Sequence, residues 1–367
     1  MKYPPTNYHD YLQLDTLLSA QKPKSSEYGF NAHDELLFIT VHQTYELWFK
    51  QILHELESVL EVFKQDQIAE RDLGVVLHRL ERIVAILKLS IGNIDILETM
   101  TPLDFLDFRD ALFPASGFQS YQFRLIEILM GLGEKQRLQF NNTPFWKHLT
   151  QKQQQDIQSY LKEQSLLDRV DAWLSRTPFV FSCHFDFRAR FSEAVREMLK
   201  NDENVVMNNP RLNADEKKKN SEQIRLSLDM FESLMNEQKF EELRRSGHFR
   251  MSHKAILGAL FISLYRDEPL LQTPYRVIHT LSDLDETLTA WRQRHALMAH
   301  RMLGRKIGTG GTSGHDYLRA AAEQHRVFTD FFNLTTFLLP RSQRPPLPEE
   351  LTRDLDFRLS SASIKGS

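Results

Sequence analysis

Two histidines in one predicted helix are the first candidates for metal chemistry. His295 and His300 both fall in the helix that the spacing of apolar residues predicts over 274–303. They are five positions apart, which places them about 140° apart around a helix of 3.6 residues per turn. One metal ion cannot bind both side chains from a regular helix. A zinc site of the i, i+4 type is therefore excluded here.

His42 is a candidate of another kind, a lone histidine among aromatic residues. The segment 33–65 contains no Pro or Gly, and its apolar residues return every three or four positions, which predicts a long helix. Phe38, His42 and Tyr45 share one face of that helix. A histidine in this setting is more often a satisfied core residue than a ligand-binding group. The spacing alone leaves both interpretations open.

Arg109 lies in the sequence Asp-Phe-Leu-Asp-Phe-Arg-Asp of residues 104–110, whose apolar spacing indicates a packed helix. A guanidinium that points inward needs an anionic partner, because an unpaired buried charge is very costly. That partner can be a neighbouring carboxylate such as Asp107 or Asp110. It can equally be the carboxylate of a substrate, whose geometry the guanidinium fork matches. The sequence alone does not decide between the two.

A glycine-rich loop, Gly-Thr-Gly-Gly-Thr-Ser-Gly at 308–314, invites comparison with a dinucleotide-binding motif. The third glycine of G-x-G-x-x-G is missing, no strand precedes the loop, and no Gly-Lys-Ser/Thr follows it. The simplest interpretation is a flexible connection between two helices. Its glycines would also let the backbone approach a ligand closely.

Helices must position these residues, since we find neither strand alternation nor a fixed-period repeat. The sequence predicts an all-α fold, a bundle of long helices in one domain over 31–340. A helical insertion at about 142–267 is richer in Gln, Lys and Glu, and the tail at 341–367 is expected to be loosely ordered. Beyond 33–65 and 274–303, helices are expected at 70–99, 102–112, 116–132, 150–175, 188–200, 214–245 and 314–338.

The composition of the 367 residues, 41% apolar and 26% charged, is that of a soluble globular protein. No apolar run reaches the roughly 18 residues of a membrane span, and residues 1–10 contain no secretion signal. The net charge of −3 gives no global attraction to nucleic acid, and Lys217 to Lys219 follow two acidic residues as one solvated helix face. The single Cys183 cannot form an internal disulfide, so we expect a packing role and a cytoplasmic protein.

Several separated segments, in order, resemble the tryptophan 2,3-dioxygenase family. The similarity extends from about Tyr8 to Pro340 and includes the insertion, so the chain resembles the longer family members more than the short bacterial ones. The segments that carry it are 33–50, similar to the distal-pocket helix; 105–109 with 114–120, similar to the substrate clamp; and 291–304 with 308–314, similar to the proximal histidine helix and its closing loop.

The resemblance implies a haem b cofactor with ferrous iron, and His295 would be its proximal ligand. Molecular oxygen would be the co-substrate and L-tryptophan the substrate. His42 matches the distal histidine that meets the indole N–H, as the catalytic residue that orients it. The other matching positions would bind substrate: Phe38 and Phe105 against the indole, and Arg109 and Thr309 at the amino-acid end.

Phe105 departs from the many short family members that carry tyrosine there, so any hydrogen bond from that hydroxyl is absent. Tyr45 is expected on the pocket face without a definite role. The resemblance also implies a homotetramer, in which an N-terminal arm (1–30) would place Tyr8, Tyr11 and Leu12 over a neighbouring subunit's pocket. The implied reaction inserts both atoms of O2 across the indole C2–C3 bond to give N-formyl-L-kynurenine. The alternatives are a haem-dependent monooxygenase on the same scaffold and a haem-based sensor.

Overall fold

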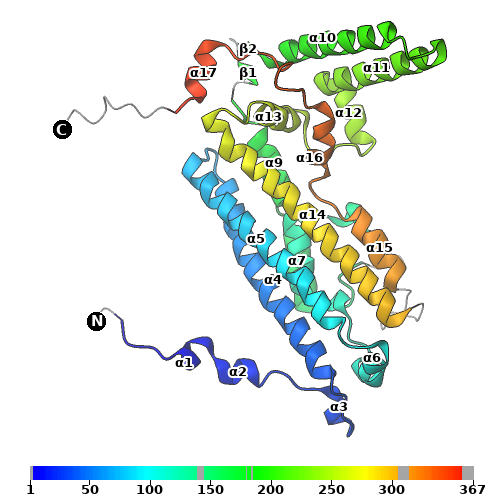
Figure 1. Cartoon of the computed structure of the whole chain (residues 1–367). Coiled ribbons are helices and arrows are strands. Elements are labelled where there is room, and N and C mark those ends of the chain that lie inside the picture. The colour runs from blue at the N-terminus through cyan, green and yellow to red at the C-terminus, as the bar shows by residue number, and fades with distance from the viewer. Residues whose placement is uncertain (1–2, 139–143, 179, 183–184, 305–313, 358–367) are drawn as a thin grey trace. The chain divides into compact units, whose positions relative to one another are not determined.

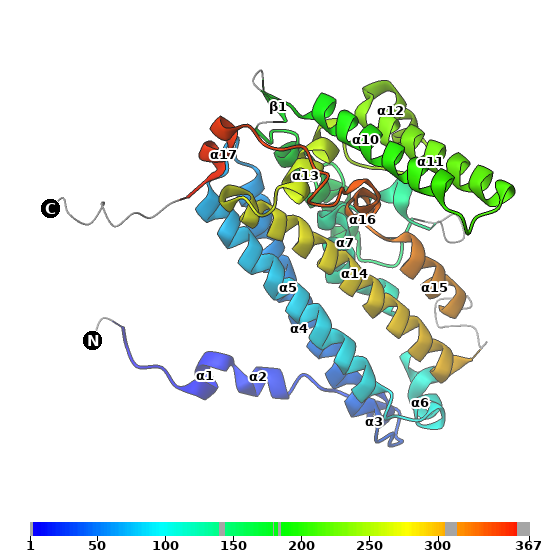
Figure 2. The ribbon, with the colours of Figure 1, turned by 45° about the horizontal axis from the view of Figure 1, so that its top comes forward.

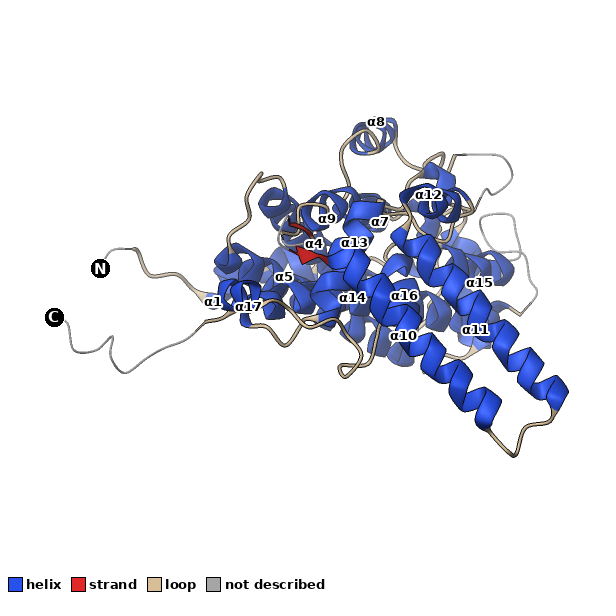
Figure 3. Ribbon diagram, turned by 90° about the horizontal axis from the view of Figure 1, so that it is seen from above, coloured by secondary structure: helices blue, strands red, loops and turns tan. Residues whose placement is uncertain are grey.

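The computed structural model describes residues 3–138, 144–178, 180–182, 185–304 and 314–357 (Figure 1). The chain forms two compact units: unit 1 comprises 1–56, 83–163 and 286–326, and unit 2 comprises 57–82, 164–285 and 327–367. The all-α prediction is confirmed. Among the described residues, strands occur only as a two-residue antiparallel pair, β1 (Phe181–Ser182) and β2 (Phe185–Asp186) (Figure 3).

Three long helices supply residues to both units: α4 (Glu35–Phe63), α5 (Glu70–Leu97) and α14 (Pro269–Leu303). Within unit 1 their segments lie side by side (Figures 1 and 2). The Tyr45 hydroxyl on α4 donates to the Ser90 carbonyl on α5 over 2.9 Å. On α14, Arg294 lies 2.6 Å from the Glu98 carboxylate, just past the end of α5. These contacts fix the three helices around the site described below.

Shorter helices complete unit 1. The capping box of Thr101 and Asp104 starts α6 (Pro102–Arg109), and Ser120 caps α7 (Tyr121–Met130). The buried Glu35 accepts hydrogen bonds from two backbone N–H groups at the start of α3, which ties that helix to α4. The remaining elements of unit 1 are α1 (Tyr8–Leu12), α2 (Leu14–Leu18), α3 (Lys24–Glu27), η1 (Asp110–Leu112), η2 (Gly117–Gln119), η3 (Glu134–Gln136), α8 (Gln151–Tyr160) and α15 (Gly314–Gln324).

Unit 2 contains an antiparallel pair of long helices, α10 (Phe187–Asn208) and α11 (Ala214–Met235), which lie side by side in Figures 2 and 3. Its other elements are α9 (Leu166–Leu174), α12 (Glu237–Arg245), α13 (His253–Leu264), α16 (Thr329–Leu334), η4 (Thr335–Phe337) and α17 (Glu349–Leu355). The described part of the tail therefore includes a helix, α17, in which Leu351 and Leu355 are buried.

Helix α13 was absent from the sequence-based expectation because its residues are apolar on every side and nearly all are buried, so no amphipathic period marks it. It packs closely on α9. A Cβ at Gly258 would lie 2.3 Å from the Leu174 carbonyl oxygen, so only glycine fits this approach.

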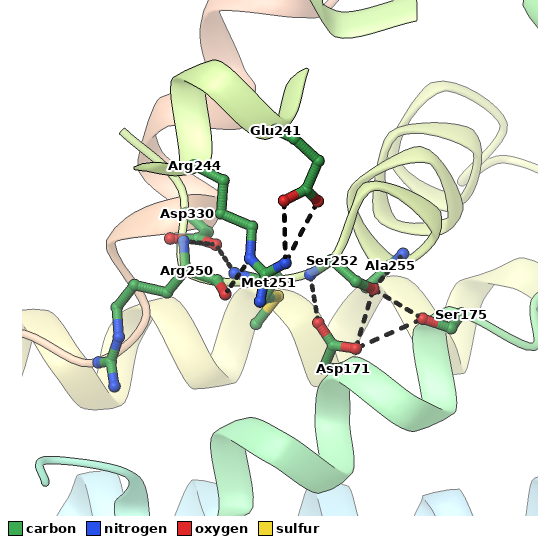
Figure 4. Close-up of polar contacts among 9 residues, drawn as sticks. All are labelled: Asp171, Ser175, Glu241, Arg244, Arg250, Met251, Ser252, Ala255 and Asp330. Carbon is green, nitrogen blue, oxygen red and sulfur yellow. Dashed lines mark hydrogen bonds and ion pairs between the residues drawn. The ribbon is translucent and has the colours of Figure 1, made fainter. Parts of the chain in front are cut away.

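Two carboxylates hold the turn that leads into α13 (Figure 4). Asp330 accepts from the backbone N–H groups of Arg250 (2.8 Å) and Met251 (2.6 Å). Asp171 accepts from the backbone N–H and the hydroxyl of Ser252, the N-cap of α13. Burial raises the pKa of Asp330, although the two backbone N–H groups oppose that shift. These bonds join α9, α13 and α16 into the core of unit 2.

Several expected helices are divided, because capping residues inside them start a new helix. Ser165 caps α9 and separates it from α8 within the expected 150–175, and Asn236 caps α12 within the expected 214–245. The expected 314–338 similarly divides into α15, α16 and η4, and 116–132 into η2 and α7. Helix α14 begins at Pro269, earlier than expected, and keeps Pro274 inside it. None of the helices, within the described ranges, has the length and apolar character needed to span a bilayer.

Candidate active site

Unit 1 encloses a cavity of about 320 Å³ between α4, α6, α7, α14 and α15. Four of the residues singled out from the sequence line it: His42, Phe105, Arg109 and His295. Tyr45 lines it too, but its hydroxyl is bound to the Ser90 carbonyl and burial raises its pKa to about 12. Tyr45 is therefore a neutral wall residue at physiological pH.

His42 presents one ring nitrogen to the cavity as an acceptor. Its Nδ1 lies 2.7 Å from the Phe38 carbonyl oxygen. A carbonyl cannot donate, so Nδ1 carries the proton in the neutral ring and Nε2 has the free lone pair. Burial lowers the pKa of His42, while the Phe38 carbonyl and the Glu46 carboxylate oppose that shift. The ring is therefore neutral near pH 7, and its accessible surface belongs to the cavity wall.

His295 is the second histidine of the cavity and the more strongly desolvated one. Burial lowers its pKa to about 4, and the nearby His42 contributes in the same direction. A neutral imidazole has a lone pair free for a metal ion. His300, five residues further along α14, does not line the cavity. Among the described residues no three His, Cys, Asp or Glu side chains are close enough to hold a metal ion.

Phe38, Phe105 and Arg109 form the wall next to His42. Phe38 lies with its ring centroid 4.1 Å from that of His42 and 5.7 Å from that of Phe105. Phe105 and Arg109 are half-buried one turn apart on α6, so a flat apolar ligand against Phe105 would have its polar end beside the guanidinium.

A cluster of charged residues forms another part of the cavity wall. The buried Glu127 carboxylate lies 2.9 Å from the guanidinium of Arg124, 2.7 Å from that of Arg137 and 2.8 Å from that of Arg292. Burial opposes the ionisation of Glu127, but the three guanidinium groups hold its pKa well below its usual range. His325 Nε2 accepts the backbone N–H of Leu138, and burial lowers the pKa of this histidine to about 4.

This cluster has more positive charge than it neutralises. Three guanidinium groups face one carboxylate and a neutral histidine, which leaves an excess of two positive charges. Arg124 Nε and both Nε and Nη2 of Arg137 are buried without an acceptor among the described residues. Buried charge of this kind is costly unless an anion completes it. The cavity therefore fits a ligand that combines a flat apolar body, a metal ion at His295 and two carboxylates, which is the chemistry of haem.

The N-terminal residues and the glycine-rich loop are not part of this cavity as described. Tyr8, Tyr11 and Leu12 lie on α1 with 74%, 74% and 40% of their surface exposed. They do not line the cavity of their own chain. Thr309 and Cys183 lie outside the described residues.

Sequence reasoning missed the Glu127 cluster, Trp291 and Glu46. Arg124 and Glu127 are three positions apart in α7, a common surface ion-pair spacing, and nothing in it shows that α7 is buried. Arg292 and His325 reach the cluster from 165 and 198 residues further along the chain. The usable signal was the Trp-Arg-Gln-Arg-His run at 291–295, where charged residues alternate with residues that the helix must bury.

Known proteins resemble this chain over nearly its full length. The sequence profile of the family described as tryptophan 2,3-dioxygenase matches residues 3–338. A protein of that name from Bdellovibrio bacteriovorus is 57% identical over 357 residues, 97% of this chain and 99% of its own length. Another from Alteromonas mediterranea is 48% identical over 355 residues, 97% and 98% of the two chains. One from Dictyostelium discoideum is 41% identical over 354 residues, 96% of this chain and 88% of its own.

Proposed function

Since the chain belongs to the tryptophan 2,3-dioxygenase family, we propose that the cavity of unit 1 binds haem b and L-tryptophan for the oxidative opening of the indole ring. The reaction inserts both atoms of molecular oxygen across the indole C2–C3 bond and gives N-formyl-L-kynurenine. The observation that carries this proposal is one cavity with two neutral histidines of different roles: His295 as a metal ligand and His42 as a hydrogen-bond acceptor.

The cofactor would be held at two places. His295 would bind the iron as proximal ligand, because its ring is neutral and buried. The two excess positive charges around Glu127 would meet the two haem propionates, and Arg124 and Arg292 line the cavity as the nearest of these cations. When bound, ferrous haem supplies the oxygen chemistry, and the protein supplies binding, orientation and the exclusion of water.

The substrate would be held by its two ends. Nε2 of His42 would accept the indole N–H, while Phe105 and Phe38 support the indole ring. Arg109 would bind the carboxylate with its guanidinium fork. Thr309 would assist there from the closing loop, as the resemblance implies. Because the indole carbon is itself nucleophilic, His42 is needed to orient the N–H and not as a strong base.

The assembly would complete the pocket. Tyr8, Tyr11 and Leu12 are exposed apolar residues on an arm that leaves its own cavity uncovered. We propose that they cover the pocket of a neighbouring subunit in a homotetramer, and that the enzyme works in the cytoplasm.

Product mass tests the proposed activity directly. The haem protein is reduced without oxygen, mixed with L-tryptophan and exposed to ¹⁸O₂. We expect a product that contains two labelled oxygen atoms. A single labelled atom would indicate a monooxygenase instead, and unchanged tryptophan would indicate a protein that binds without turnover.

A further inference from the structure

Glu46 lines the substrate cavity without a role in the reaction described above. It lies one helical turn after His42 on α4, so both side chains belong to the same face of that helix. Its side chain is half-buried, and an ionised carboxylate in such a position needs hydrogen-bond donors.

The donors come from the segment that begins α7. The Ser120 hydroxyl donates to Glu46 Oε1 over 2.6 Å, and Gln122 Nε2 donates to Glu46 Oε2 over 2.8 Å. Gln122 Nε2 also donates to the backbone carbonyl of Glu46 over 2.8 Å. Each carboxylate oxygen thus receives one donor, and a third contact bonds the same amide to the α4 backbone.

The bonded segment forms one wall of the cavity. Ser116, Gly117, Phe118 and Ser120 all line it, directly before α7. Ser120 also accepts the backbone N–H of Phe123 as the N-cap of α7, so its hydroxyl connects the helix start to Glu46. The carboxylate further lies near the N-terminal end of α7, where the helix dipole favours a negative charge.

We propose that Glu46 is a positioning residue that holds the segment 116–122 against α4 and thereby sets the width of the pocket between His42 and the opposite wall. This inference rests on the proposed function. Glu46 acts through Ser120 and Gln122 rather than by contact with the substrate. Loosening these bonds should therefore weaken the binding of any indole ligand, whatever charges that ligand carries.

Glu46→Gln is the first test, with steady-state kinetics on L-tryptophan. The glutamine oxygen can still accept from Ser120, but its NH₂ group cannot accept from Gln122. We expect KM to rise about 2- to 10-fold, the factor that corresponds to one net hydrogen bond, while kcat changes less than about 2-fold. Glu57→Gln on the exposed side of the same helix is the matched control and should leave both constants unchanged.

Gln122→Leu tests the connection independently and replaces the first variant if that one does not retain haem. It should raise KM by a similar factor, and the double variant should be no worse than either single variant, because both remove the same contact. Multiplying effects, or a normal KM in Gln122→Leu, would overturn the proposal.

Indole-3-propionate, which lacks the ammonium group, separates positioning from direct contact. If Glu46→Gln weakens binding of this ligand and of L-tryptophan by the same factor, Glu46 acts through the wall. If only L-tryptophan is affected, Glu46 binds the substrate ammonium and the positioning role is wrong. Failure of the wild type to consume tryptophan at all would instead refute the proposed function.

Discussion

Trp291 lies flat against His295, with their ring centroids 5.4 Å apart and their planes 14° apart. The two residues are one turn apart on α14. Trp291 is itself held by Tyr45, Phe49 and Phe123, whose ring centroids lie 6.0, 6.3 and 5.1 Å away. The stack therefore fixes the plane of the imidazole and with it the direction in which its lone pair points.

We expect Trp291→Leu to loosen the cofactor while the fold remains. Loss of a stacked aromatic pair costs about 0.5–1.5 kcal/mol beyond lost burial, so haem should dissociate about 2- to 13-fold faster. Trp291→Phe, which keeps a ring against His295, should lose less. Transfer of haem to excess apomyoglobin measures the rate. Equal rates in the wild type and both variants would show that the stack does not orient the ligand.

The cluster around Glu127 gives a second prediction, that haem and apoprotein respond differently to Arg124→Gln. If the excess positive charge meets the propionates, loss of one guanidinium should weaken haem binding about 10-fold or more, since hydrogen bonds to charged groups contribute about 1.5–3 kcal/mol. The apoprotein carries the same charge uncompensated, so its melting temperature should change less than that of the holoprotein.

Haem dimethyl ester is the control for this charge effect, because it has no free propionates. The wild type and Arg124→Gln should bind the ester with similar affinity. A variant that loses haem and the ester to the same extent would indicate a packing defect, and the cluster would then have no role as a carboxylate site.

Local signals predicted most of the fold. The length of α4 followed from a segment without Pro or Gly, and α5 and α14 from the same kind of period. Breaks such as the one at Ser165 were missed, because a serine before an acidic residue also occurs inside helices. Helix α13 was missed because uniform burial removes the amphipathic pattern on which such predictions depend.

The site divided along the same line. His42, Arg109 and His295 attract attention by their residue types, but their convergence in one cavity depends on contacts between segments more than 60 residues apart. The tautomer of His42 depends on one backbone carbonyl, that of Phe38, and becomes visible only in the folded helix. Glu127 could not be recognised because the three arginines around it come from three separate segments.

Arg109→Leu tests the carboxylate clamp. If Arg109 binds the substrate carboxylate in the cavity, its loss should weaken productive tryptophan binding by about 2–5 kcal/mol, as for truncated buried charge pairs. The variant should also lose the wild type's preference for tryptophan over tryptamine, which lacks the carboxylate. Steady-state kinetics on both substrates measure this. A wild type that handles them equally would make Arg109 a structural residue.

His325 should make the protein sensitive to acid. Its pKa in the folded state is about 4, below the unfolded value of 6.5, because it is buried neutral. Its contribution to stability is therefore complete above roughly pH 6.5 and is lost as the pH falls toward 4, by about 1.4 kcal/mol per pH unit. In His325→Gln, whose amide oxygen can still accept the Leu138 N–H, this dependence should be weaker by about one proton.

Urea unfolding of the two proteins at several pH values measures that slope. His54→Gln, at an exposed position of α4, is the matched control and should keep the slope of the wild type. A wild-type slope that persists in His325→Gln would mean that this histidine is already accessible to protons in the folded state.

His42→Ala should lower turnover of tryptophan by tens of fold without abolishing it. Nε2 would no longer accept the indole N–H, which costs about 0.5–1.5 kcal/mol net, or about 1–3 kcal/mol if the N–H stays unpaired in a dry pocket. 1-Methyltryptophan has no N–H and should clash with His42, so it should be a poor substrate of the wild type. Alanine relieves that clash, and the methylated substrate should therefore suffer less from the substitution than tryptophan does. Equal losses on both substrates, with haem spectra unchanged, would show that His42 does not contact the indole nitrogen. A fall in haem content or melting temperature would instead assign His42 to the core, where its Nδ1–H bond to Phe38 would be its main contribution.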